Sequence, residues 1–313
     1  MSPRVDRLVH VGNVIIDLVM NIPALPKAGG DVLATSSQVT PGGGYNVMVA
    51  AARQGLPVAY GGAHGSGPFG EIARARLAEA GIAVLQEATP GADTGFDVAL
   101  VDGDGERTFA TSTGAEARLT YEQLAEIRVG TADAVYVSGY GLVYPDNRAA
   151  LARWIGTLPG EATVVVDPGP LVADIPVSVL EPVLARTDWW SCNLREATIM
   201  TGYADPERAA AALAELTGRA GVVVRMGPDG CLLTGPGAGV RYVPAFEATA
   251  VDSNGAGDAH VGVFVAALAD GLSPVQAARR ANAAAAIAVT RQGPATAPGR
   301  EETDRFLARS QGA

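Results

Sequence analysis

The sequence is poor in cysteine, in aromatic residues and in positive charge. Of its 313 residues, 2 are cysteines and 5% are aromatic, and 23 lysines and arginines stand against 33 aspartates and glutamates. Cys192 and Cys231 match no metal-ligand spacing, and nothing in the pattern supports a disulfide between them. We therefore interpret both as small, buried, apolar residues.

The shortage of positive charge leaves a formal net charge of -10 and a pI near 4.8. An acidic surface argues against nucleic acid or an anionic membrane as the main partner. A phosphorylated ligand is not excluded, because a local group of backbone amides can bind an anion on an acidic protein. No apolar run is long enough to span a bilayer, and the first residues lack the pattern of a secretory signal. We therefore expect a soluble, cytoplasmic protein.

What the sequence does have is a hydrophobic content of 48% and a repeated alternation of strand-like and helix-like segments. Short β-branched runs at 58–65, 162–169 and 221–227 are separated by helical patterns such as 68–81. This alternation predicts parallel βαβ units. We expect an α/β fold with a doubly wound, mostly parallel central sheet flanked by helices, in one domain that spans residues 1–313.

A few segments break this alternation. Residues 94–116 have the pattern of two strands joined at the turn DGDG, which predicts an antiparallel hairpin. Residues 31–40 form an extended, half-polar pattern, and 8–19 a buried strand that runs into a loop. We expect the segments near 12–40 and 94–115 to form a small β-sheet beside the core. Ligands of open α/β sheets bind beyond the carboxyl ends of the strands, where the polar and glycine-rich turns should gather.

The stretch DSNGAGDAH, residues 252–260, places two glycines at the start of a long apolar helix pattern. The first amides of a helix have no partners within it, and Gly255 and Gly257 let an anion approach them closely. The carboxylate of Asp258 could then accept a proton from a hydroxyl that attacks a phosphoryl group. A motif of this length alone is more often an ordinary helix start, and we interpret His260 as a packing residue.

Other motifs change that interpretation. DSNGAGD resembles the second signature of the ribokinase (PfkB-type) family of carbohydrate kinases, D-T-x-G-A-G-D, with Ser253 where threonine is usual. PGGGYN, residues 41–46, resembles the first signature, and Asp17 matches an aspartate of the family's opening strand. The likeness runs through almost the whole chain. Ile15 and Pro41 depart from the family pattern, and both lie where the resemblance places the sugar pocket.

The resemblance also marks a nucleotide side. NLRE matches the motif N-x-x-E, which the family associates with phosphate and magnesium; a glutamate there would act through water-bound Mg²⁺. VVVRMGPDG resembles the nucleotide-binding turn, and ANAAAAIAV the segment on the adenine side. Two roles stay open: Arg225 meets a phosphate or caps a strand end, and Asn282 contacts ligand or makes a structural hydrogen bond. The residues expected on the ATP side are Asn193, Glu196, Arg225, Gly227, Gly230 and Asn282.

The resemblance implies an ATP-dependent kinase that phosphorylates a sugar-like hydroxyl by in-line transfer, with Asp258 as general base. It implies Mg²⁺ as cofactor, a small β lid over the sugar, and a homodimer formed through that lid. It also allows a monovalent cation such as K⁺ beside Asp252, Asn254 and Gly293. The amides of Gly255, Ala256 and Gly257 would stabilise the transferred phosphoryl group. The expected substrate-binding residues are Asp17, Gly42, Gly43 and Asn46.

Several alternatives stay open. A kinase of the same fold that acts on a nucleoside, on pseudouridine or on a keto-deoxy sugar acid differs only in its substrate pocket. A sugar- or nucleotide-binding sensor without turnover is a second alternative. A dinucleotide-dependent oxidoreductase is a weaker one, because the first strand lacks the glycine fingerprint. Asp97 could contact substrate hydroxyls, but we expect it to face solvent. Asp167 could line the cleft, although an acid at the end of a βα unit is ordinary.

Overall fold

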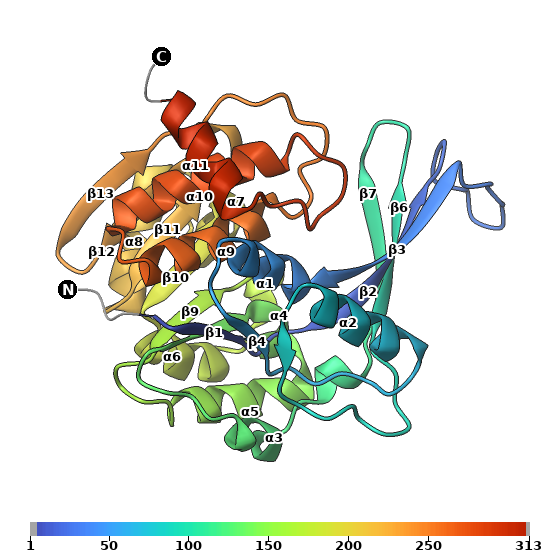
Figure 1. Cartoon of the computed structure of the whole chain (residues 1–313), viewed down its shortest axis with the longest axis horizontal. Helices are drawn as coiled ribbons and strands as arrows, with labels where there is room; N and C mark the ends of the chain where they lie inside the picture. The colour runs from blue at the N-terminus through green and yellow to red at the C-terminus, as the bar shows by residue number, and fades with distance from the viewer. Residues whose placement is uncertain (1–4, 311–313) are drawn as a thin grey trace.

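A nine-stranded sheet crosses the centre of the computed structural model, which describes residues 5–310 (Figure 1). Its neighbouring strands are parallel from β5 to β11, and two antiparallel strands, β12 and β13, extend one edge. In spatial order the strands are β13 Ala238–Val243, β12 Cys231–Gly235, β11 Gly221–Arg225, β10 Trp189–Asn193, β9 Thr163–Asp167, β8 Asp133–Ser138, β1 Arg7–His10, β4 Val58–Tyr60 and β5 Ala83–Val84.

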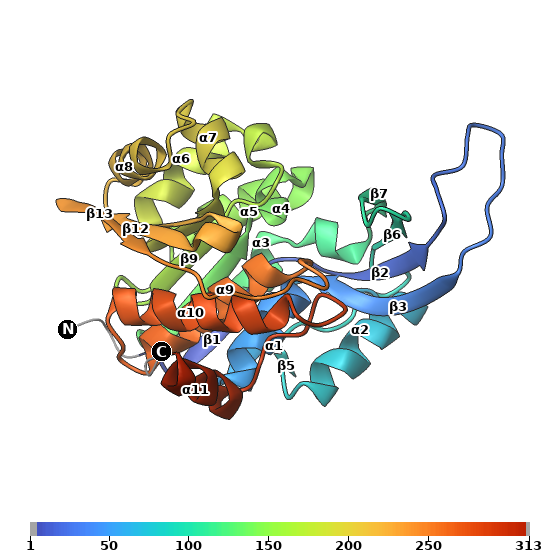
Figure 2. The same ribbon diagram turned by 90° about the horizontal axis from the view of Figure 1, so that it is seen from above.

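Helices cover both faces of this sheet, as Figure 2 shows from above. One face carries α3 Tyr121–Glu126, α4 Gly139–Val143, α5 Pro145–Ile155, α6 Val177–Arg186, α7 Leu194–Thr201 and α8 Pro206–Thr217. The other carries α1 Gly44–Arg53, α2 Pro68–Glu79, α9 Ala256–Ala269, α10 Pro274–Ala288 and α11 Arg300–Arg309. The predicted doubly wound α/β fold is confirmed. Among residues 5–310, no helix combines the length and the apolar character that crossing a membrane needs.

Local sequence signals explain several element ends. Asp205 caps α8 by accepting a hydrogen bond of 2.8 Å from the amide of Arg208. Ser273 and Gln276 form a capping box at the start of α10. Cys192 and Cys231 are fully buried and unpaired, which agrees with their interpretation as apolar core residues.

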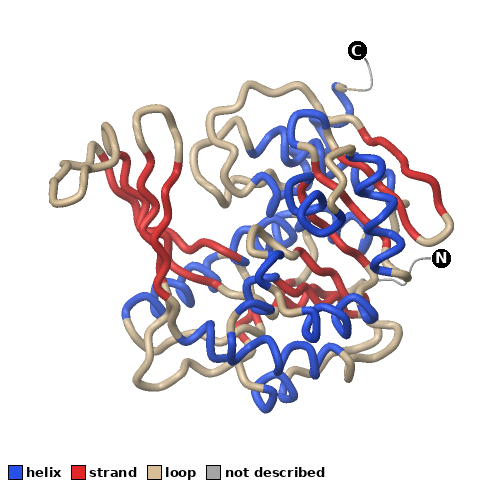
Figure 3. The backbone as a smooth tube through the Cα atoms, turned by 180° about the vertical axis from the view of Figure 1, so that it is seen from behind, coloured by secondary structure: helices blue, strands red, loops and turns tan. Residues whose placement is uncertain are grey.

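A separate four-stranded sheet projects from the main body, with its strands standing apart in the view from behind (Figure 3). β2 and β6 are parallel to each other, and the two outer pairs are antiparallel. This sheet combines the two segments predicted to lie outside the parallel core. In spatial order its strands are β3 Ser36–Gly43, β2 Val14–Asn21, β6 Phe96–Val101 and β7 Arg107–Ser112.

Two strand predictions were wrong in their bounds. Residues 8–19, predicted as a buried strand that runs into a loop, contribute to two strands: β1 ends at His10, and β2 begins at Val14 in the other sheet. The chain turns at Gly12, where a Cβ atom would lie 2.6 Å from the His10 ring and 2.7 Å from Ser138. β3 begins at Ser36 rather than at residue 31 and runs through Pro41. Proline is tolerated there because β3 is an edge strand.

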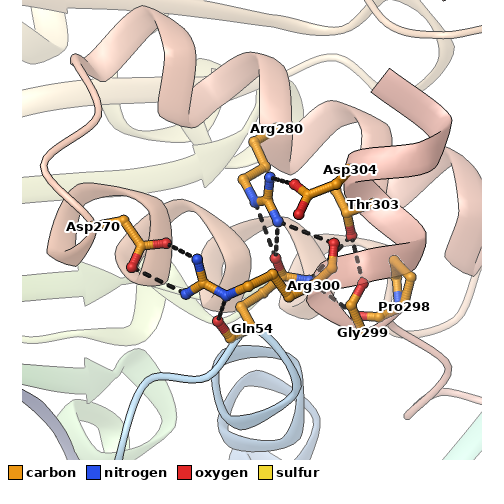
Figure 4. Close-up of polar contacts among 8 residues, drawn as sticks. All are labelled: Gln54, Asp270, Arg280, Pro298, Gly299, Arg300, Thr303 and Asp304. Carbon is orange, nitrogen blue, oxygen red and sulfur yellow. Dashed lines mark hydrogen bonds and ion pairs between the residues drawn. The ribbon is translucent and has the colours of Figure 1, made fainter. Parts of the chain in front are cut away.

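The C-terminal segment is fastened to α1, α9 and α10 by a polar network around Gln54 (Figure 4). The Gln54 Oε1 atom accepts hydrogen bonds from Arg280, and its Nε2 atom donates to the Pro298 carbonyl and to Thr303. Arg300 donates to the Gln54 carbonyl and pairs with Asp270. Gln54 is almost fully buried, so these partners replace the water that its amide would otherwise bind.

Candidate active site

The predicted site residues gather at the carboxyl edge of the main sheet, around two adjoining cavities. The first has a volume of about 370 Å³ and lies between the small sheet and the ends of β8, β9 and β11. The second has a volume of about 720 Å³ and is bordered by the β11–β12 turn, α9 and α10. Arg225 and Gly257 line both cavities, so the cavities meet at the start of α9.

The site residues predicted from the sequence are distributed between these two cavities. Gly42, Asp252 and Gly255 line neither cavity and lie behind the walls. The first cavity is lined by Asp17, Gly43, Asn46, Glu196, Gly257 and Asp258, and the second by Asn193, Gly227, Gly230, Ala256, Gly257 and Asn282, with Arg225 common to both. Sequence reasoning missed Tyr140 and Tyr144, which also line the first cavity. They follow β8 at the edge where ligands of such sheets bind, which is the signal that could have found them.

The start of α9 presents backbone amides at the junction. Gly255 has φ +73°, and a Cβ atom there would lie 2.1 Å from the Pro294 carbonyl oxygen, so this position requires glycine. The Ala256 amide is used by the Ser253 carbonyl, at 3.3 Å. Within the described residues, the amides of Gly257 and Asp258 donate no hydrogen bond. The Gly255 amide also donates none among the described residues, so of the three predicted amides only that of Ala256 is engaged.

Asp258 is held by a residue from the other signature. The Nδ2 atom of Asn46, in the first turn of α1, donates a hydrogen bond of 3.0 Å to the Asp258 Oδ2 atom. Removal of Asp258 from water raises its pKa to about 6, although the Asn46 hydrogen bond acts in the opposite direction. The nearby charge of Asp167 raises this pKa further, and Arg225 lowers it. Asp258 is therefore mainly ionised near pH 7.

The glycines of PGGGYN make room for polar groups of the first cavity. A Cβ atom on Gly42 would lie 2.1 Å from the Asp17 carboxylate, and Gly43 has φ +60° just before α1. Asp17 is buried, and its loss of hydration, with the charges of Asp97 and Asp258, raises its pKa to about 8. Of the two departures from the family pattern, Ile15 lines the cavity wall. Pro41 belongs to β3 and does not line the cavity.

The expectation that Asp97 faces solvent was wrong. Its side chain is only 7% exposed and lines the first cavity, beside Asp17 on the neighbouring strand. Strand alternation could have revealed this, because Asp97 shares a face with the buried Ala99. Burial raises the pKa of Asp97 to about 6.

Asn193 and Glu196 form a reciprocal capping box at the start of α7. The Glu196 amide donates to the Asn193 side chain at 2.9 Å, and the Asn193 amide donates back to Glu196 at 2.8 Å. Burial and the nearby charge of Asp167 raise the pKa of Glu196. Arg225 pairs with Asp167 at 2.9 Å and lies 3.9 Å from Glu196. Asp167 is thus part of the cleft and not merely an acid that closes a βα unit.

The second cavity is lined by a glycine-containing turn and by the side chain of Asn282. Gly227 and Gly230 have φ +59° and +93°, and they shape the turn after β11. Asn282 donates to the carbonyls of Val243 and Pro244, each at 3.0 Å, and its Oδ1 atom lies 3.1 Å from the His260 ring. The structural role of Asn282 is therefore shown, and it also lines the cavity. Burial lowers the pKa of His260 to about 3, so its ring is neutral.

Asp252 is already held by a cationic partner. Arg107, from β7 of the small sheet, forms an ion pair with its carboxylate, which is almost fully buried. Asp252 also accepts hydrogen bonds from the amides of Asn254 and Gly293, at 2.9 and 3.0 Å. These contacts lower its pKa despite its burial. They also tie the small sheet to the loop that leads into α9.

The chain is similar in sequence and in structure to known sugar kinases. The crystal structure of the ribokinase from Thermotoga maritima superposes with a TM-score of 0.80 at 25% identity, covering 96% of this chain and 99% of that one. The sugar kinase YegV of Escherichia coli is 34% identical over 302 residues, covering 93% of this chain and 91% of the relative. The ATP-dependent ribose-1-phosphate kinase of Halopiger xanaduensis is 32% identical over 308 residues, covering 96% and 98%.

The fold is thus ribokinase-like, which defines the class. The family description "pfkB family carbohydrate kinase" matches residues 5–300, nearly the whole chain. The chain belongs to the pfkB family of carbohydrate kinases.

Proposed function

We propose that this chain transfers the γ-phosphoryl group of ATP to a hydroxyl group of a sugar by in-line displacement. The observation that carries the proposal is the junction of the two cavities at the start of α9. There the unpaired amides of Gly257 and Asp258 lie beside the Asp258 carboxylate. Such an arrangement can hold a phosphoryl group next to the base that activates its acceptor.

Asp258 acts as the general base in this proposal. Its pKa of about 6 leaves it ionised near neutral pH and still basic enough to take a hydroxyl proton during transfer. Asn46 fixes the carboxylate by the hydrogen bond to its Oδ2 atom, which leaves the Oδ1 atom available for the acceptor hydroxyl. The Gly257 amide and the helix dipole stabilise negative charge on the transferred group. Asp17 and Asn46 hold the remaining hydroxyls.

ATP is the proposed phosphoryl donor, and the second cavity is its proposed site. The cavity reaches from the Gly227–Gly230 turn to α10, and Arg225 and Gly257, which would hold the phosphates, lie where it meets the first cavity. The relative from Halopiger xanaduensis is named as ATP-dependent, which supports the same donor here. Arg225 would then balance phosphate charge while it stays paired with Asp167.

The residues present fit Mg²⁺ that is held through water. Asp167 and Glu196 place two carboxylates on the first cavity near Arg225, and oxygen ligands of this kind suit a hydrated Mg²⁺. Within the described ranges, no group of three or more acids, histidines or cysteines forms a closed metal cage. When bound, the ion would neutralise charge on the ATP phosphates.

The small sheet is proposed as a lid over the sugar. Phe109 and Thr111 of β7 line the first cavity from this side. Val39 of β3 is a half-exposed apolar side chain on the opposite face of this sheet, and a homodimer is proposed to form through the sheet. The proposed location of the enzyme remains the cytoplasm.

A screen of ATP consumption over pentoses, hexoses, sugar acids and nucleosides tests this function. The proposal expects at least one sugar to be phosphorylated in a Mg²⁺-dependent reaction, with the phosphorylated product identified by mass spectrometry. Turnover of nucleosides alone would favour the nucleoside-kinase alternative. Binding of sugar and ATP without any turnover would favour the sensor and contradict the proposal.

A further inference from the structure

The first cavity carries a pair of carboxylates that the phosphoryl transfer does not use. Asp17 of β2 and Asp97 of β6 are direct partners in the parallel ladder of the small sheet. Residues at the same register of neighbouring strands project to the same face, about 4.8 Å apart along the sheet. Both side chains line the cavity, and both are more than nine-tenths buried. A strand that alternates polar and apolar residues would normally place an apolar side chain at this inward position.

The buried side-chain polar atoms that line this cavity and lack a partner are all acceptors. Within the described residues, the Oδ1 atoms of Asp97, Asn13 and Asn46 are buried and make no hydrogen bond. All three residues line the first cavity. An unpaired buried acceptor is costly, and it is retained where a ligand supplies the donor. The missing partner therefore carries several hydrogen-bond donors, as a molecule with neighbouring hydroxyl groups does.

The charge on the cavity wall decides between neutral and anionic ligands. Five acids line the cavity, and Arg225 is the single cationic side chain among its described lining residues. Arg225 is paired with Asp167 at 2.9 Å and faces the second cavity as well. No cation therefore stands beside Asp17 and Asp97. A carboxylate or phosphate on that end of the substrate would meet the negative charge of Asp97 in a poorly hydrated site.

We infer that Asp97 is a specificity-determining residue. Together with Asp17, it holds neighbouring hydroxyls of an uncharged sugar and disfavours the binding of sugar acids and sugar phosphates. This inference rests on the proposed sugar kinase function and names its substrate class. Asp97 would contact the substrate away from the reacting hydroxyl, which lies at Asp258. Its contribution should therefore appear mainly in substrate binding.

The test compares the wild type with two Asp97 variants and a charge control. Asp97→Ala removes the acceptors, whereas Asp97→Asn keeps the shape and removes the charge. Asp104→Asn removes one negative charge from the exposed turn of the same sheet, where it meets neither cavity. Each protein is assayed with a neutral sugar, its acid and its phosphate, such as ribose, ribonate and ribose-1-phosphate, and with other pentose and hexose sets. Thermal unfolding of each variant checks that the fold is retained.

The wild type is expected to prefer the neutral member of each set that it accepts. Asp97→Ala should raise KM for the best neutral sugar by about tenfold or more, as expected for loss of a charge-assisted hydrogen bond, with a smaller change in kcat. KM for ATP should stay the same. Asp97→Asn should reduce the preference for the neutral sugar over its anionic counterpart. Asp104→Asn should behave as the wild type.

Three results would overturn the inference. One is a wild-type preference for a sugar acid or a sugar phosphate. Another is an unchanged sugar KM in a folded Asp97→Ala variant. The third is a clear preference for amino sugars, which would make the carboxylate pair an ammonium site. Calorimetric titration with the same sugars separates this inference from the proposed function. If neutral sugars bind through Asp97 without turnover, the kinase proposal fails and the specificity inference stands.

Discussion

The side chain of Asn46 donates a hydrogen bond of 3.0 Å to the carboxylate of Asp258, across 212 residues of sequence. The two residues occupy the first turns of α1 and α9, which pack against each other. The bond fixes one oxygen of the carboxylate and favours its charged form, against the effect of burial. It joins the substrate side of the site to the helix start that presents the free amides.

The pH dependence of the reaction should report the ionisation of Asp258. Because only the ionised carboxylate can accept a proton, kcat/KM is expected to fall with the ionised fraction as the pH drops through about 6. Above that value the rate should level off. Steady-state assays between pH 4.5 and 8.5, with the stability of the protein checked at each pH, measure this acidic limb of the pH–rate profile. A rate that is level down to pH 5 would contradict the assignment of Asp258 as base.

Replacement of Asn46 by alanine should shift the acidic limb of the pH–rate profile. Loss of the N–H donor removes an interaction that favours the charged carboxylate, so the pKa of Asp258 should rise. The acid limb of Asn46→Ala is then expected at higher pH than in the wild type, together with a higher KM for sugar. An unshifted limb in a folded variant would show that the hydrogen bond has no influence on the base.

Asp17 is expected to cost the protein stability at neutral and alkaline pH. Its pKa in the folded state, about 8, lies above the ordinary value of 3.8, so the folded protein binds the extra proton between these values. The stability associated with that proton is complete below the ordinary pKa and is lost as the pH rises through about 8. Asp17→Asn cannot ionise, so its advantage in the free energy of unfolding should grow over this range. At pH 8 it should exceed about 1 kcal/mol, because one pKa unit corresponds to ~1.4 kcal/mol.

Denaturant unfolding of both proteins at several pH values tests this prediction, with the sugar absent. The same Asp17→Asn variant should bind sugar poorly, since a carboxylate that accepts hydroxyl donors has been lost. Equal stability of the variant and the wild type from pH 5 to pH 9 would show that burial does not raise the pKa of Asp17.

Arg107 should make the reaction insensitive to K⁺. Its guanidinium neutralises Asp252, the carboxylate beside which the family resemblance allows a monovalent cation. At fixed ionic strength, exchange of K⁺ for a large organic cation is therefore expected to leave the wild-type kcat unchanged. Arg107→Gln should lower kcat and make it rise with added K⁺, because Asp252 then lacks a cation. Strong K⁺ activation of the wild type would contradict this view.

Much of the fold and of the candidate site was predictable because the signals are local. The glycines at 42, 43 and 255, the capping residues and the β-branched runs each act over a few residues of sequence. They gave the α/β class and the separate small sheet. Together with the family resemblance they identified several residues that line the two cavities, but not Tyr140 and Tyr144.

The remainder depends on contacts between distant segments. The ion pair of Arg107 with Asp252 joins residues 145 apart, and the Asn46–Asp258 bond joins residues 212 apart, so neither leaves a local pattern. The inward position of Asp97 follows from strand pairing with β2, which fixes the face it occupies. The division of residues 8–19 between two sheets also requires the three-dimensional packing at Gly12.

The most direct test of the account is the turnover of Asp258→Asn with the best sugar identified in the screen. Asparagine keeps the shape and the contact with Asn46 but cannot take the proton. Folding and ATP binding should be nearly unchanged, while kcat should fall by roughly 10²–10⁴-fold, the usual contribution of a general base. A folded Asp258→Asn protein that keeps more than about a tenth of the wild-type kcat would contradict the central claim.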